Sequence, residues 1–288
     1  MILIISLSIS VLFILWLLYQ NNIFDWLCST IVTCSQRYRS HRYAKRIILI
    51  RHGESQGNQD SNIYATVPDH AIGLTEKGRA QALHCGNELK KLIGKNETIF
   101  CYVSPFRRSR QTCELICKAF PNGNLIPIRE DPRIREQEWG NLQNLAIKEK
   151  TTAERKIIGR FFYRFGNGES GADVYDRVSS FMDSLYRKMD YTLKPNNNIL
   201  IISHGLFMRL FLMRFYRWSV EKFETLENFN NCNYCILERC DETGRFILKT
   251  ELKLYPESKT IENEQSLLEE VNPSIHMVNI ENQEKKND

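Results

Sequence analysis

Three short, continuous apolar runs are the feature that most constrains how this 288-residue chain can fold. They occupy residues 47–50, 99–103 and 199–202. A run with no polar alternation is typical of a parallel strand that is buried on both faces. Apolar residues with helical spacing lie between the runs, beginning after Thr75, a candidate N-cap. This alternation predicts an α/β fold: a three-layer, open, mostly parallel sheet with helices on both faces.

The sequence outside these runs predicts four parts of different character. Residues 46–255 form the folded domain, which ends in a strand pair at 232–238 and 245–252 joined by a turn. Residues 1–20 form an apolar segment, and residues 21–45 form a basic linker. Residues 256–288 carry eight acids against three lysines and few large apolar side chains, which predicts a disordered acidic tail.

The apolar segment predicts a membrane anchor. Residues 1–19 carry no charged side chain, and that length just spans a bilayer as a helix. A cleaved signal peptide is the alternative, but there is no positive n-region and no clear cleavage site. A buried core helix is a weaker alternative, because the segment is apolar all round. The five Lys and Arg of residues 37–46 follow, so the positive-inside rule predicts a single-pass protein whose C-terminal part is cytosolic. Glycosylation of the sequon at Asn96 would require a luminal domain instead.

Charge and cysteine content exclude several classes of protein. The formal net charge of +5 suits an anionic ligand but falls short of a nucleic-acid-binding footprint, so no nucleic acid is expected as a partner. The nine cysteines are scattered and odd in number, which argues against a disulfide framework. Cys101, Cys113 and Cys117 are interpreted as small buried hydrophobes. The CxxC of Cys232 and Cys235 is interpreted as strand residues, because no second CxxC or matching histidine pair accompanies it.

Polar residues follow each apolar run at the point where ligands bind in open α/β sheets. Arg51, His52 and Gly53 come directly after the first run, and His204 and Gly205 come after the third. Gly53 allows a sharp turn and a close approach of the backbone to a ligand. Both histidines are therefore expected at the same edge of the sheet.

The second run leads into a predicted helix start that contains Arg107, Arg108 and Arg110. A helix N-terminus attracts anions, and guanidinium groups match the oxygens of a phosphate. A further segment, residues 133–140, places charges of both signs beside Trp139 and Gly140. Two histidines and several arginines at strand ends predict a phosphate site. The sequence contains no cluster of metal-ligating residues that would predict a metal site.

Five motifs occur in the order of a known family. They are LIRHGES at 49–55, SPFRRSRQT at 104–112, REQEWGNLQ at 135–143, GESGADVYDR at 168–177 and ISHG at 202–205. The sequence resembles the histidine phosphatase superfamily, in the branch of cofactor-dependent phosphoglycerate mutases and their phosphatase relatives, branch 1. The resemblance covers about residues 45–255, and its third and fourth motifs are most similar to a fungal and plant subgroup of phosphoglycerate-mutase-like proteins.

The resemblance implies a role for each matching residue. His52 would be the nucleophile that forms a phosphohistidine, and Glu136 would donate a proton to the leaving group, with Glu138 as a close rival. The residues expected to bind the transferred phosphoryl group are Arg51, Arg108 and His204. Further substrate contacts are expected from Asn58, Arg107, Arg135 and Gly205. Glu169 and Ser170 match the GES motif, but capping of the following helix would explain them equally well. No metal and no other cofactor is expected.

The expected activity is hydrolysis of a phosphate ester, whose organic part is a small molecule, a lipid or a protein. A phosphoglycerate mutase-type phosphotransferase is the first alternative, but the segment at 137–167 is compact for an enzyme that must enclose its substrate. A catalytically silent, membrane-tethered binding module is the second alternative, and the presence of every matched catalytic position argues against it.

Overall fold

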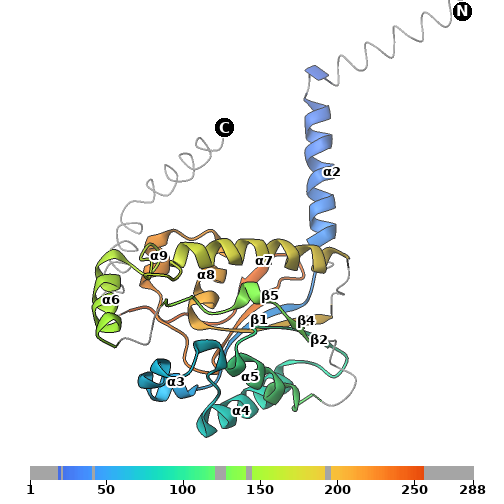
Figure 1. Ribbon diagram of the computed structural model, residues 1–288. Coiled ribbons are helices and arrows are strands. Elements are labelled where there is room, and N and C mark those ends of the chain that lie inside the picture. The colour runs from blue at the N-terminus through green and yellow to red at the C-terminus, as the bar shows by residue number, and fades with distance from the viewer. Residues whose placement is uncertain are drawn as a thin grey trace, which may run out of the picture.

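The computed structural model describes residues 19–20, 22–40, 43–120, 128–140, 145–191 and 196–255 (Figure 1). The predicted membrane anchor at 1–20 therefore lies outside the described residues, except for its last two, and so does the predicted acidic tail at 256–288. The first long described helix is α2 (Ile23–Ser40), which projects from the sheet domain (Figure 1). Within the described part of the chain, no helix combines the length and the apolar character needed to cross a bilayer.

A six-stranded sheet forms the centre of the domain, in the order β3-β2-β4-β1-β5-β6. Its strands are β1 (Arg46–Arg51), β2 (Thr98–Val103), β3 (Arg129–Glu130), β4 (Asn197–Ser203), β5 (Tyr234–Arg239) and β6 (Phe246–Leu248). The first four in spatial order run parallel, while β5 is antiparallel to both of its neighbours. The mostly parallel sheet predicted from the sequence is confirmed, and the three apolar runs form its adjacent strands β2, β4 and β1.

Each central strand contributes side chains to two separate cores. Successive side chains of a strand point to opposite faces, so Ile47 and Leu49 join one hydrophobic cluster while Ile48 and Ile50 join the other. Helices α7 (Gly171–Tyr191) and α8 (Gly205–Tyr216) supply the first cluster. Helices α4 (Glu76–Leu92) and α5 (Arg107–Cys117) supply the second. This arrangement is the predicted three-layer fold (Figure 1).

Shorter elements connect the layers. They are α3 (Gln56–Gln59), the 3-10 turns η1 (Ser61–Ala65), η2 (Asp69–Ala71) and η3 (Pro132–Ile134), and helices α6 (Leu145–Ile158) and α9 (Val220–Thr225). Thr75 is the N-cap of α4, as predicted, because its hydroxyl oxygen accepts a hydrogen bond from the backbone N–H of Gly78. Strand β3 was not predicted, since its two residues are exposed and carry no apolar pattern.

The late strand pair is confirmed, but both strands are shorter than predicted. Cys232 lies before β5 with a φ of 56°, a left-handed conformation that a strand does not contain. Cys235 is a buried strand residue, so the interpretation of the CxxC as strand residues holds for Cys235 and is wrong for Cys232.

Candidate active site

The carboxyl ends of three adjacent parallel strands bring the candidate site together. His52 follows β1 and donates its backbone N–H to the carbonyl of Ser203 at the end of β4, at 3.0 Å. Ser104 follows β2 and bonds in the same way to Ile202, at 3.0 Å. A cavity of about 260 Å³ lies at this edge. Its lining includes the predicted residues Arg51, His52, Asn58, Arg108 and Glu136.

His52 is held as a neutral imidazole with one defined tautomer. Its side chain is buried, and Nδ1 lies 2.7 Å from the carbonyl oxygen of Gly53. A carbonyl only accepts hydrogen bonds, so Nδ1 carries the proton and Nε2 keeps its lone pair. Burial, followed by the positive charges of Arg108 and Arg51, holds the pKa of His52 well below its ordinary value. The imidazole is therefore a competent nucleophile at neutral pH.

The guanidinium groups of Arg51 and Arg108 line the same cavity as His52. Arg51 donates from Nη1 to the carbonyl of Phe229, while its buried Nε has no hydrogen-bond partner among the described residues. Burial lowers the pKa of Arg51. Arg108 is buried, whereas Arg51 is partly exposed, and Arg108 Nη1 donates to the carboxylate of Asp69 at 2.6 Å and to the backbone carbonyl of Asp69 at 2.8 Å. Among the described residues, these two cations, one buried and one partly buried, have a single carboxylate contact, that of Arg108 with Asp69, which favours an additional anion in the cavity.

Two helix N-termini add to this positive field. Helices α5 and α8 both begin at the carboxyl edge of the sheet, directly after β2 and β4. Neither N-cap residue, Phe106 or His204, makes a side-chain capping hydrogen bond. The first N–H groups of a helix carry partial positive charge and need acceptors, so both starts favour an anion at this edge.

His204 lies behind the cavity wall rather than on it. Its ring is fully buried, with its centroid 5.2 Å from that of His52. Nε2 is 2.8 Å from the hydroxyl oxygen of Ser104, and Nδ1 is 3.6 Å from Oε2 of Glu136. Burial, then the charge of Arg108, holds the pKa of His204 well below its ordinary value. His204 is thus placed to contact both His52 and Glu136, and a direct contact with a ligand stays a prediction.

Glu136 is the carboxyl group that faces the cavity. Its side chain is 13% exposed, and burial raises its pKa. Arg177 holds the backbone of this segment, donating to the carbonyl of Arg133 at 2.7 Å and to that of Glu136 at 3.4 Å. Glu138 is exposed and does not line the cavity. The geometry therefore favours Glu136 over its rival as a proton donor.

Asn58 joins the cavity through a capping motif. Its Oδ1 accepts hydrogen bonds from the backbone N–H of Ser55 and from Nδ2 of Asn231, both at 3.1 Å. Ser55 is the N-cap of α3, and the two residues form a reciprocal capping box. Because the oxygen takes both bonds, the amide nitrogen is the end that can donate to an anion.

Three predicted substrate contacts lie outside the cavity. Arg107 is exposed, because one residue along a helix turns the side chain by about 100° away from its neighbour Arg108. Arg135 pairs with Oε1 of Glu169 at 2.7 Å. Gly205 faces Asn228, and a Cβ added to Gly205 would lie 1.8 Å from Oδ1 of Asn228. The absence of a side chain at Gly205 therefore leaves space for Asn228, which lines the cavity. The positions of these three residues do not favour a direct contact with a ligand in this cavity.

The GES motif is structural in this arrangement. Glu169 pairs with both Arg135 and Arg177, each at 2.7 Å. The Ser170 hydroxyl accepts a hydrogen bond from the backbone N–H of Asp173 at 3.2 Å and donates to the Asp173 carboxylate at 2.8 Å, which caps the start of α7. Through Arg177, this cluster fixes the segment that carries Glu136.

The structure adds residues that sequence reasoning did not identify. They are Ser61, Tyr64, Trp139, Thr151, Phe165 and Asn228. Trp139 and Phe165 form an aromatic wall, with ring centroids 4.9 Å apart and the Arg155 guanidinium 4.9 Å from the Trp139 ring centroid. Trp139 could have been found from its place in the REQEWGNLQ motif. The others come from connecting segments or α6 and carry no signal of spacing or composition.

Comparison with known proteins supports the family that the sequence motifs indicate. Residues 47–251 match the family model described as the histidine phosphatase superfamily, branch 1. Over 207 residues the chain is 47% identical to phosphoglycerate mutase-like protein AT74H of Arabidopsis thaliana, covering 67% of this chain and 74% of the relative. It is 27% identical over 296 residues to broad-range acid phosphatase DET1 of Saccharomyces cerevisiae, covering 72% of this chain and 89% of the relative. A mycobacterial glucosyl-3-phosphoglycerate phosphatase solved with VO3 shares the fold, with a TM-score of 0.56, 20% identity, and coverage of 74% of this chain and 99% of that one.

Proposed function

This chain belongs to the histidine phosphatase superfamily, branch 1, and from that premise we propose that it hydrolyses phosphate esters through a phosphohistidine at His52. The observation that carries the proposal is the environment of His52. Its Nδ1 donates to Gly53, and its Nε2 is left unprotonated in a cavity that the guanidinium groups of Arg51 and Arg108 also line. This combination supplies a nucleophile and positive charge for the phosphoryl oxygens.

The first half-reaction forms the covalent intermediate. Nε2 of His52 attacks phosphorus, and the bond from phosphorus to the ester oxygen breaks. Glu136 donates its proton to that oxygen, so the leaving group departs as a neutral alcohol. Arg51 and Arg108 neutralise the negative charge that spreads over the three phosphoryl oxygens, and Asn58 donates a further hydrogen bond. His204 lies beside both groups, with its ring 5.2 Å from that of His52 and its Nδ1 3.6 Å from Oε2 of Glu136.

The second half-reaction regenerates the enzyme. The Glu136 carboxylate takes a proton from a water molecule, whose oxygen attacks the phosphohistidine. The bond from phosphorus to Nε2 breaks, inorganic phosphate leaves, and Glu136 is again protonated. The chain's own residues therefore account for every proton in the cycle.

The substrate that best suits this cavity is a small phosphate ester. A volume of about 260 Å³ holds a phosphoryl group and a modest organic part. Tyr64, Trp139 and Phe165 also line it, which favours an organic part with a flat or apolar face. The name of the yeast relative, a broad-range acid phosphatase, supports hydrolysis of more than one phosphate ester.

Hydrolysis of a panel of small phosphate esters without added metal tests this function. Release of inorganic phosphate that persists in the presence of a chelator is the expected result. A mutase would instead exchange the phosphoryl group between isomers of monophosphoglycerate when primed with 2,3-bisphosphoglycerate. We expect little exchange relative to hydrolysis, and rapid exchange would support the mutase.

Activity is expected to be greatest at acidic to neutral pH. Rate falls at low pH as His52 becomes protonated, and its pKa lies below the ordinary value of 6.5. Rate falls at high pH as Glu136 loses its proton, and its pKa lies above the ordinary value of 4.5. A profile of kcat/KM against pH should therefore be bell-shaped, and a rate that keeps rising into alkaline pH would contradict these roles.

Replacing Glu136 with Gln should remove the alkaline limb of that profile. The amide cannot donate a proton, so we expect a loss of about 10²- to 10⁴-fold for esters of alcohols. Esters with good leaving groups need less protonation and should lose less. The matched control is Glu138→Gln, which alters an exposed side chain outside the cavity and should retain activity. Equal losses in both variants would contradict the assignment of the acid.

The N-terminal segment leads us to propose a location for the protein, at a membrane. The apolar residues 1–19 support a single-pass anchor with a cytosolic phosphatase domain, and exposed Trp26 and Ile31 on α2 are compatible with a nearby membrane. Alkaline carbonate extraction of cell membranes should leave the full chain in the membrane fraction. A chain without residues 1–20 should be released, and release of the full chain as well would contradict the anchor.

A further inference from the structure

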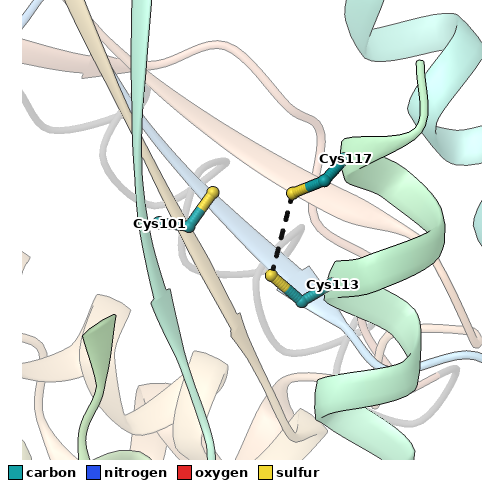
Figure 2. Close-up of side chains that lie close together, drawn as sticks. All are labelled: Cys101, Cys113 and Cys117. Atoms are coloured by element: carbon teal, nitrogen blue, oxygen red, sulfur yellow. Dashed lines mark hydrogen bonds between the residues drawn. The ribbon is translucent and has the colours of Figure 1, made fainter. Parts of the chain in front are cut away.

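Three cysteines that are far apart in sequence meet between β2 and α5. Cys101 lies on β2, and Cys113 and Cys117 lie on α5, with their side chains directed toward one another (Figure 2). All three sulfur atoms lie within 4.8 Å of one another, and those of Cys113 and Cys117 are 4.0 Å apart. The sequence interpretation treated them as separate buried hydrophobes and did not bring them together.

The fold explains why the sulfurs converge. Residues four apart on a helix share a face, so Cys113 and Cys117 point in one direction. That face packs against the side of β2 that carries Cys101, within the same hydrophobic cluster as Ile99 and Ile116. Cys101 is fully buried and Cys113 is nearly so, while Cys117 is partly exposed. An ion or small molecule could therefore reach the cluster at Cys117.

The spacing of the sulfurs fits a metal ion at their centre. A metal–sulfur bond of about 2.3 Å places the three sulfurs of a planar trigonal site about 4.0 Å apart. The observed separations need only a small contraction to reach that geometry. In the part of the chain that the structure describes, no fourth His, Cys, Asp or Glu belongs to the cluster.

We propose that Cys101, Cys113 and Cys117 form a three-sulfur binding site for Cu(I). Soft thiolate ligands select Cu(I), and this ion accepts three ligands, whereas structural zinc is almost always four-coordinate. On binding, sulfur–copper bonds replace S–H bonds and the displaced protons pass to solvent. Copper stays Cu(I), so the step needs no oxidant or reductant.

Binding of copper at the three cysteines would change the positions of groups in the phosphate-binding cavity. Helix α5 carries Arg108 in its first turn, and Thr112 beside Cys113 accepts a hydrogen bond from the backbone N–H of Gly53 at 3.0 Å. Strand β2 leads into Ser104, which contacts His204. Copper that draws α5 toward β2 therefore shifts Arg108 in the cavity and Ser104 beside His204, and bound Cu(I) should lower phosphatase activity.

Titration of the reduced full chain with Cu(I) under oxygen-free conditions, in competition with bicinchoninate, tests the proposal. The wild type should bind one Cu(I) tightly, and X-ray absorption should show a shell of three sulfurs. Cys117→Ser should weaken that binding by about 100-fold or more. This partly exposed position is the least disruptive of the three to change, and thermal melting checks that the variant folds.

The matched control is Cys240→Ser, a partly exposed cysteine outside the cluster, which should leave the tight site intact. Equal affinity in wild type and Cys117→Ser would overturn the proposal, and so would loss of the site in Cys240→Ser. Recovery of the cluster as a disulfide, two hydrogens lighter by mass, would show thiol pairing and would also overturn it. Copper binding is measured without substrate, so its failure is distinct from failure of the proposed phosphatase function.

Discussion

Replacing His52 with Ala is expected to lower kcat/KM by about 10⁴-fold or more, the largest loss of any single substitution in the chain. Without the imidazole, the cavity loses the nucleophile that takes up the phosphoryl group in this mechanism. Direct attack by water would have to occur in a site arranged around Nε2, with Glu136 protonated and unable to activate that water. Steady-state hydrolysis of the best ester from the panel measures the effect.

The control for this substitution is His84→Ala. His84 is exposed on α4 and does not line the cavity, and its loss should leave kcat/KM unchanged. Because the His52 ring is buried, thermal unfolding must also show that His52→Ala retains its fold. A folded His52→Ala enzyme with near wild-type turnover would contradict the role of this residue.

Replacing Arg108 with Ala is expected to cost about 10²- to 10³-fold in kcat, or about 3–4 kcal/mol of transition-state stabilisation. Its guanidinium lines the cavity in a buried setting, where charge on the transferring phosphoryl oxygens is poorly screened. Arg108→Lys should recover only part of the loss, because an ammonium group cannot present two parallel N–H donors.

The adjacent residue provides a matched control for Arg108. Arg107→Ala removes the same charge from the same turn of α5 but from an exposed side chain outside the cavity, and it should leave kcat nearly unchanged. Removal of Arg108 also leaves Asp69 without its ion-pair partner, so stability is measured alongside. Similar losses for both variants would indicate a general charge effect and contradict a specific phosphoryl contact.

The histidines and arginines at the centre of the site are predictable from the sequence, because they come directly after apolar runs that form strands. Apolar runs buried on both faces identify β1, β2 and β4, and parallel strands end at one edge of a sheet. The sequence therefore predicts His52, His204 and the arginines of α5 at one edge of the sheet. The same reasoning predicted the layers of the fold, which rest on side-chain alternation along those strands.

Other parts of the site depend on details that sequence spacing does not contain. Arg107 and Arg108 could not be separated, because the choice rests on the rotation of α5 about its axis. Glu136 and Glu138 lie in an irregular segment, where no period tells which side chain faces inward. Phe165 and Asn228 reach the cavity only through tertiary packing of connecting segments. The cysteine cluster likewise depends on how α5 packs against β2.

The most direct test of the account is capture of the covalent intermediate. The wild type is mixed with a ³²P-labelled ester, stopped rapidly with denaturant at alkaline pH, and digested for peptide mapping. The account predicts one label on the peptide that contains His52, stable in alkali and lost in acid, and no label in His52→Ala. Rapid turnover of substrate by the wild type with no labelled enzyme, or with the label on another residue, would contradict the phosphohistidine mechanism.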